Sequence, residues 1–128
     1  MDLGIRNRTA LVTGGDSGIG WHTARLLLEE GATVVLSDKD QDALDEAAAK
    51  LGAAEGRLFA FAADVTSADD LAELHRKTRD AVGDIDILVQ SSGVTGAQGK
   101  FHEIDDEGWT STIEIDLLGP VRLTREFL

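Results

Sequence analysis

The chain has 128 residues, a length that suits one domain with a hydrophobic core of its own. Its formal net charge of −12 excludes the basic surfaces that bind nucleic acid or anionic membranes. It has no cysteine, no basic-then-apolar leader and no run approaching the ~20 apolar residues of a membrane span. We therefore expect a cytoplasmic protein without disulfides, metal sites or a cysteine nucleophile.

Short apolar runs alternate with amphipathic segments in the first half of the chain. The runs Thr9–Thr13 and Thr33–Ser37 predict buried strands, because they are apolar and rich in β-branched residues. Apolar residues at helical spacing predict helices over Ile19–Glu30, which Gly31 ends, and over Gln41–Leu51.

The alternation continues in the second half. Strands are predicted at Leu58–Ala62 and Ile85–Val89, with a helix between them that Thr66 or Ser67 caps. The small, polar segment Ser91–Gly99 predicts a loop.

A last helix is expected to begin near Asp105 or Asp106 and to run toward Leu128. Gly119-Pro120 should kink it, because proline lacks a backbone donor and clashes with the preceding turn.

Four βα units in a row predict the fold class. Buried strands alternating with helices indicate an α/β, Rossmann-like, doubly wound parallel sheet, with a visible strand order 3-2-1-4. We expect residues 1–128 to form a single domain that is incomplete at its C-terminal side.

The strongest motif is Thr13-Gly14-Gly15-Asp16-Ser17-Gly18-Ile19-Gly20, which lies between a predicted strand and a predicted helix. Gly14 allows a sharp turn, Gly18 lets the backbone approach a pyrophosphate, and Gly20 permits close helix–strand packing. Phosphates are expected at the N-terminus of the helix, where free N–H groups favour negative charge. The motif therefore predicts a dinucleotide site rather than an unliganded turn.

Acidic residues follow the second and third predicted strands. Asp38 is placed to accept hydrogen bonds from an adenosine ribose, which favours NAD over NADP. The neighbouring Lys39 is a cation that can accept a 2′-phosphate. Asp64-Val65 lies along the same crevice, and Asp64 either contributes to this site or only starts a turn.

These segments resemble the short-chain dehydrogenase/reductase family over essentially the whole chain. The matching positions are Thr13-Gly14-x-x-x-Gly18-Ile19-Gly20, Asp38, Asp64-Val65, Asp86 to Val94, Trp109 and Ile115 to Gly119. The resemblance implies reversible hydride transfer between a nicotinamide coenzyme and an alcohol or carbonyl substrate. It also implies that Asp64 binds the adenine, that Val65 lines its pocket, and that Gln90 and Gly93 lie near the coenzyme.

Two positions depart from the family pattern. The family usually has Asn-Asn-Ala-Gly where this chain has Gln90-Ser91-Ser92-Gly93, and Gln90 is a longer amide that can substitute. Asp116 stands where the family often has a catalytic asparagine. We expect Asp116 either to alter a proton relay or to be an ordinary polar residue at a helix kink.

The family's catalytic serine and Tyr-x-x-x-Lys pair lie beyond this segment, and the 128 residues contain no tyrosine. We expect the chain to be the N-terminal, coenzyme-binding half of a longer NAD(P)-dependent oxidoreductase, to be inactive alone and to self-associate as a homo-oligomer. The alternative is a non-catalytic dinucleotide-binding or interaction module from a truncated gene.

Overall fold

Four parallel strands form one sheet in the computed structural model, which describes residues 1–128. The sheet order is β3-β2-β1-β4, and this confirms the predicted fold class and strand order. The bounds of the strands are β1 (Thr9–Thr13), β2 (Thr33–Ser37), β3 (Leu58–Ala60) and β4 (Ile87–Gln90).

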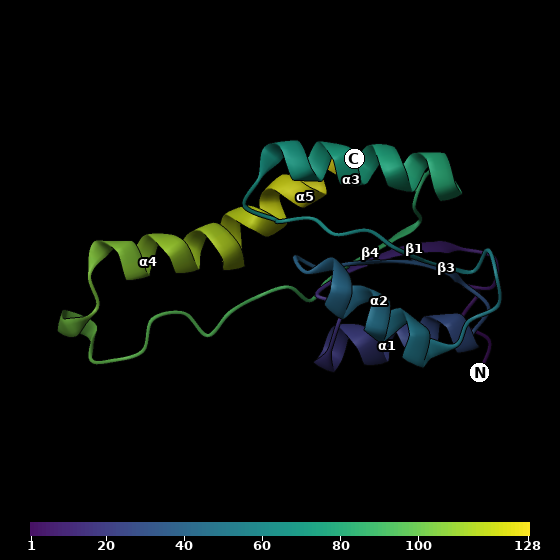
Figure 1. Cartoon of the computed structure of the whole chain (residues 1–128), viewed down its shortest axis with the longest axis horizontal. Helices are drawn as coiled ribbons and strands as arrows, with labels where there is room; N and C mark the ends of the chain where they lie inside the picture. The colour runs from purple at the N-terminus through teal and green to yellow at the C-terminus, as the bar shows by residue number, and fades with distance from the viewer.

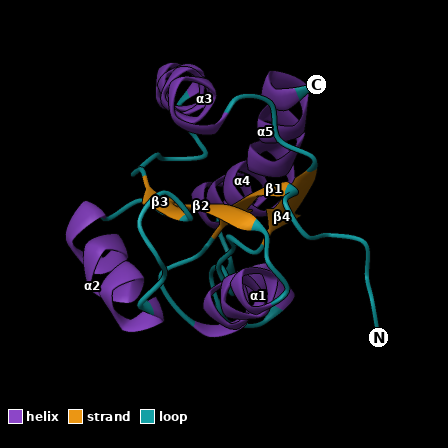
Figure 2. Cartoon of the chain, turned by 90° about the vertical axis from the view of Figure 1, so that its right-hand side faces the viewer, coloured by secondary structure: helices purple, strands orange, loops and turns teal.

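Helices cover both faces of this sheet. Figure 2 shows α1 and α2 on one face and α3 and α5 on the other, while Figure 1 shows α4 and the loop before it extending away from the sheet. None of the helices is both long enough and apolar enough to cross a membrane. Their bounds are α1 (Gly18–Glu29), α2 (Gln41–Leu51), α3 (Ala68–Val82), α4 (Asp106–Ile113) and α5 (Gly119–Phe127).

The core has two halves because successive side chains of a strand point to opposite faces of the sheet. Leu11 of β1 packs with Leu71 and Leu74 of α3 on one face. Val12, the next residue of β1, packs with Ala24 of α1 and Leu44 of α2 on the other face. All six side chains are at most 2% exposed, so both helical layers are anchored on the central strand.

Helix ends follow the predicted local chemistry. Gly31 adopts a φ of +90° just after α1, as expected of a glycine that ends a helix. The Ser67 side chain accepts a hydrogen bond from Asp70 N at the start of α3, so Ser67 rather than Thr66 is the cap.

Three strand boundaries differ from the prediction, namely the end of β3 and both ends of β4. β3 ends at Ala60 instead of Ala62. The amides of Phe61 and Ala63 still donate to the carbonyls of Leu36 and Asp38, and the Ala62 amide donates to the side chain of Gln41 (3.0 Å). β4 covers Ile87–Gln90 instead of Ile85–Val89, and before its start the Asp86 carboxylate accepts a hydrogen bond from Thr9 N (2.9 Å).

The last helix also differs, because it is divided into α4, a π-helical turn over Glu114–Leu118, and α5. The irregularity precedes Gly119-Pro120 rather than lying on it. The amide of Gly119 donates to the carbonyl of Glu114, five residues back. Pro120 has no amide hydrogen and its ring conflicts with the carbonyl four residues back, so a wider turn just before it relieves that conflict.

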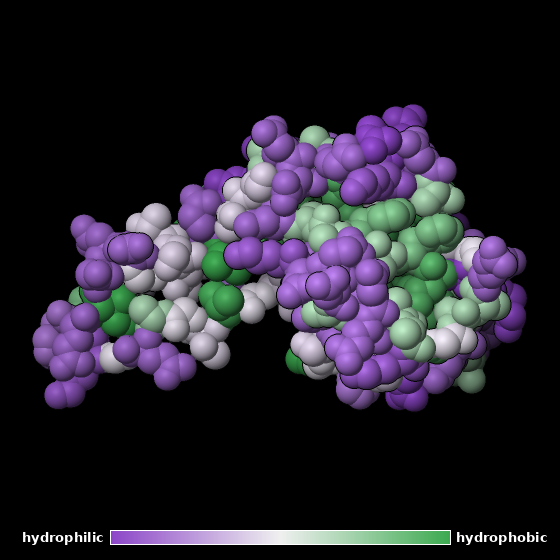
Figure 3. Space-filling model, in the orientation of Figure 1, coloured by the Kyte–Doolittle hydropathy of each residue, from purple (hydrophilic) through white to green (hydrophobic).

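The surface is strongly polar, in keeping with the acidic composition. Figure 3 shows hydrophilic residues over most of the visible face, with apolar residues gathered between α3 and α2 at the β3 edge of the sheet. Acidic residues outnumber basic ones by 24 to 12, so this polar surface is predominantly negative.

Candidate dinucleotide site

The glycine turn joins the carboxyl end of β1 to α1 and is held by close backbone contacts. A Cβ at Gly14 would lie 2.5 Å from the Ser91 carbonyl carbon, and one at Gly20 only 2.0 Å from the Gly14 carbonyl oxygen. Any side chain at these two positions would force the turn away from α1 or from the loop after β4. The predicted packing role of Gly20 is therefore present in the structure.

Gly18 differs from the other two glycines because the space beside it is open. It has a φ of +55°, and a Cβ there would meet nothing within 4 Å. The neighbouring Ile19 side chain is 80% exposed. An open backbone next to an exposed apolar side chain fits the close approach of a ligand.

The amides at the start of α1 have no side-chain partner. Ser17 caps this helix without a side-chain hydrogen bond to it, and the first turn carries no acidic residue. The Ser17 hydroxyl donates instead to the Asp16 carboxylate (3.2 Å). The N-termini of α2, α3 and α4 are each capped by a side chain and have acidic first turns. The start of α1 is thus the helix N-terminus best suited to an anion.

Asp38 follows β2 at the carboxyl ends of the strands, on the same side of the sheet as the glycine turn. Its carboxylate accepts a hydrogen bond from Lys39 N (2.6 Å). Partial burial raises the pKa of Asp38, and the nearby Asp16 and Asp40 carboxyl groups raise it further. Asp16 and Asp38 therefore bring two carboxyl groups to one side of the glycine turn.

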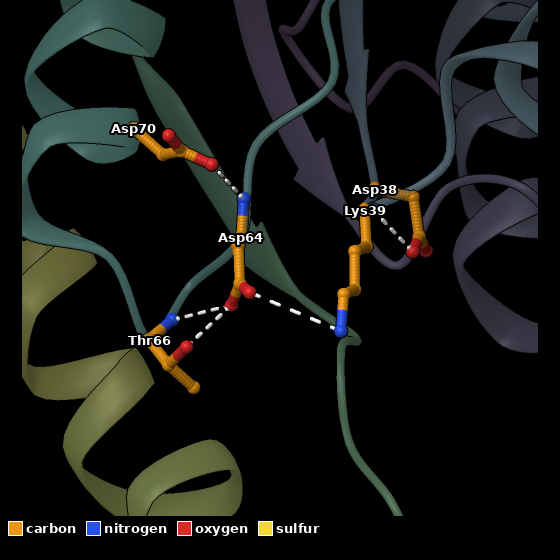
Figure 4. Close-up of polar contacts among 5 residues, drawn as sticks. All are labelled: Asp38, Lys39, Asp64, Thr66 and Asp70. Carbon is orange, nitrogen blue, oxygen red and sulfur yellow. Dashed lines mark hydrogen bonds and ion pairs between the residues drawn. The ribbon is translucent and has the colours of Figure 1, made fainter.

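Lys39 and Asp64 point toward each other across this edge, as Figure 4 shows. The Lys39 Nζ lies 3.9 Å from Asp64 Oδ2. Asp64 Oδ1 accepts hydrogen bonds from the Thr66 amide (2.9 Å) and hydroxyl (2.7 Å). These bonds, and secondarily Lys39, lower the pKa of Asp64. Asp64 therefore does start a turn, and its second oxygen still faces the site.

The loop after β4 contacts the glycine turn and the π-helical turn. Asp116 Oδ1 accepts a hydrogen bond from Val94 N (2.9 Å), and a Cβ at Gly93 would lie 3.3 Å from the same oxygen. Asp116 thus holds the loop in place as an acceptor, a contact that its sequence pattern did not indicate.

Gln90 and Val65 contact the C-terminal helical segment. The Gln90 side-chain amide donates to Thr124 Oγ1 on α5 (2.7 Å), so its hydrogen-bonding partner is α5. Val65 packs closely on Gly119, where a Cβ would lie 2.9 Å from Val65 Cγ2. Gln90 and Asp116 line an open groove of about 520 Å³ beside α5.

A family model described as short chain dehydrogenase matches residues 8–128. The chain belongs to the short-chain dehydrogenase family. A curated relative, cis-4-hydroxycyclohexanecarboxylate dehydrogenase of Sinomonas cyclohexanicum, is 42% identical over 119 residues, which are 93% of this chain and 47% of that protein. The 3-oxoacyl-[acyl-carrier-protein] reductase of Thermotoga maritima is 30% identical over 121 residues, covering 94% of this chain and 49% of that protein.

Solved structures of short-chain dehydrogenases share the fold. A short-chain dehydrogenase/reductase (glucose/ribitol dehydrogenase) from Brucella melitensis has a TM-score of 0.91 and 38% identity, covering 99% of this chain and 53% of that one. L-Sorbose reductase from Gluconobacter frateurii, complexed with NADPH and L-sorbose, has a TM-score of 0.88 and 34% identity, covering 99% and 48%. The chain spans about half the length of the relatives that it matches.

Proposed function

We propose that this chain is the coenzyme-binding part of an NAD(P)-dependent oxidoreductase. The observation that carries the proposal is the open N-terminus of α1, where uncapped amides lie beside the unobstructed Gly18. The turn from Gly14 to Gly20 would hold the pyrophosphate, Asp38 the adenosine ribose, and Asp64 with Val65 the adenine. The bound coenzyme supplies a hydride, exchanged with an alcohol or carbonyl substrate.

We further propose that the coenzyme is NAD rather than NADP. Asp38 offers an acceptor to ribose hydroxyls, whereas a 2′-phosphate would meet the carboxyl groups of Asp38 and Asp16 together. The single nearby cation, Lys39, is directed to Asp64. A family relative solved with NADPH shows that the fold also accepts NADP, so the preference rests on these side chains.

Titration of the purified chain with NADH and NADPH tests this preference. We expect tighter binding of NADH, and a loss of about one to two decades of NADH affinity in Asp38→Ala, since a hydrogen bond to a charged acceptor contributes about 1.5–3 kcal/mol. Lys39→Ala is the matched control, and it should leave the NADH-to-NADPH ratio close to that of the unmodified chain. Tighter binding of NADPH, lost in Lys39→Ala, would reverse the assignment.

We propose that the protein is cytoplasmic. We also propose that the 128 residues alone do not catalyse turnover. The family's tyrosine general acid/base has no counterpart here, because the chain contains no tyrosine. Such a group contributes roughly 10²–10⁴-fold to the rate. Coenzyme-dependent turnover by the purified chain would contradict this, whereas coenzyme binding without turnover also fits a non-catalytic binding module.

We also propose self-association of the chain. β4 pairs only with β1, so its other edge is open to another strand. Leu117 of the π turn and Val121 of α5 line the groove and are 57% and 49% exposed. A monomer at high concentration in sedimentation would contradict this proposal.

A further inference from the structure

The ion pair between Glu114 and Arg122 spans the π-helical turn that carries Asp116. Arg122 Nη1 lies 2.7 Å from Glu114 Oε2, and the two side chains are only 26% and 35% exposed. The other intrahelical ion pairs join residues three or four apart and are more exposed, such as Arg25 with Glu29 at 47% and 55%. The Glu114–Arg122 pair is therefore unusual in both spacing and shielding.

The spacing of this pair matches the π-helical turn. Two turns of a regular α-helix take about 7.2 residues, so residues eight apart would be about 80° out of line. One π turn accommodates about one more residue, so eight residues then complete about two turns. Glu114 and Arg122 consequently lie one above the other on the same face only while the π turn is present.

The same residue carries both interactions that define this turn. The Glu114 carbonyl accepts the hydrogen bond from Gly119 N, and its carboxylate accepts the bond from Arg122. The latter bond lowers the pKa of Glu114, which keeps the carboxylate charged. The backbone register and the ion pair therefore support each other.

We infer that Glu114 and Arg122 are positioning residues that lock the π turn and thereby hold Asp116 against the loop after β4. Asp116 lies within the locked turn and accepts the hydrogen bond from Val94 N. The Ser91 and Ser92 backbone of that loop packs on Gly14, at 2.5 to 2.6 Å from the position of a Cβ there. The π turn that the ion pair spans is thus connected to the glycine turn through Asp116 and the loop after β4.

Hydrogen exchange of the Val94 amide in the 128-residue chain tests this inference without any coenzyme. We expect exchange at Val94 to be about tenfold faster in Arg122→Gln and in Glu114→Gln, while amides of β1 keep their protection, because only a local opening is eased. The charge-swapped double variant Glu114→Arg/Arg122→Glu should restore slow exchange, since the coupling between the two charges is kept. Arg25→Gln, which breaks an exposed ion pair, should leave Val94 unchanged.

Unchanged Val94 exchange in both single variants would overturn the inference. So would a double variant that exchanges as fast as the singles. Arg122→Gln can lower overall stability so that β1 also loses protection. Glu114→Gln and the double variant then still test the inference, because exchange at Val94 is compared with exchange in β1 of the same protein.

Discussion

Asp38 and Asp64 lie at the same edge of the sheet, yet the pKa values of their carboxyl groups shift in opposite directions. Burial and neighbouring carboxyl groups raise the pKa of Asp38, whereas hydrogen bonds from Thr66 lower that of Asp64. Asp64 therefore stays ionised to lower pH, while Asp38 takes up a proton first. From the proposed role of Asp38 in coenzyme selection, we expect that selection to depend on pH.

The preference for NAD⁺ over NADP⁺ is expected to narrow as the pH falls. Protonated Asp38 loses its negative charge, so NAD⁺ loses a charged acceptor and a 2′-phosphate meets less repulsion. Because the pKa of Asp38 is raised, this change begins above the ordinary aspartate value of about 3.9. The ratio of dissociation constants, measured by calorimetry across acid pH, checks it.

Asp38→Asn is the control for this pH dependence. The 2′-phosphate itself titrates near pH 6, and its contribution is the same in both proteins. The contribution of Asp38 is the difference between the two proteins in how the ratio of the NAD⁺ and NADP⁺ dissociation constants changes with pH. Identical pH profiles for the two proteins would exclude Asp38 as the titrating group.

The sequence could predict where a side chain lies when its residue directly follows a strand. Asp38 and Asp64 follow β2 and β3 at the expected edge. The partners of Gln90 and Asp116 could not be predicted, because Thr124 and Val94 lie 34 and 22 residues away along the chain. Such contacts depend on how α5 and the loop after β4 pack, which no local pattern reports.

At the scale of elements, β1, β2 and α2 have the predicted bounds because their patterns are unambiguous. The predicted end of β3 at Ala62 was wrong because the apolar run continues past Ala60, where the regular pairing with β2 stops. The π turn was not predicted. Pro120 lacks an amide hydrogen, which indicates that the helix is disturbed nearby, but this does not indicate where the helix accommodates an extra residue.

Gly18 and Gly52 have similar left-handed backbone conformations, so comparing substitutions at the two positions distinguishes an effect on coenzyme binding from an effect on stability. Gly18 and Gly52 have φ values of +55° and +60°, and neither has an atom within 4 Å of an added Cβ. Gly18→Ala and Gly52→Ala should each lower the free energy of unfolding by about 1–2 kcal/mol, the cost of a left-handed residue with a Cβ. Only Gly18→Ala should also weaken NADH binding, because its Cβ would occupy the space that the pyrophosphate needs.

Chemical denaturation and NADH titration of both variants check this expectation. Gly20→Ala should be more damaging than either, because its Cβ would lie 2.0 Å from the Gly14 carbonyl oxygen. Equal NADH affinity in Gly18→Ala and Gly52→Ala would remove Gly18 from the proposed site.

At the scale of the whole molecule, the candidate site is assembled from segments far apart in sequence. The turn at the start of α1, the residues after β2 and β3, and the loop after β4 meet because parallel strands place their carboxyl ends at one edge. The opposite edge of the sheet and the outer faces of α2 and α3 carry no part of this site. A dinucleotide should therefore affect a single side of the molecule.

Titration of the ¹⁵N-labelled chain with NAD⁺, followed through the chemical shift of each backbone amide, tests directly whether the dinucleotide binds at the start of α1. We expect the largest shifts to cluster in Gly14–Gly20, at Asp38 and at Asp64-Val65, with little change in the outer faces of α2 and α3. No shifts at millimolar NAD⁺, or shifts centred away from the start of α1, would contradict this expectation.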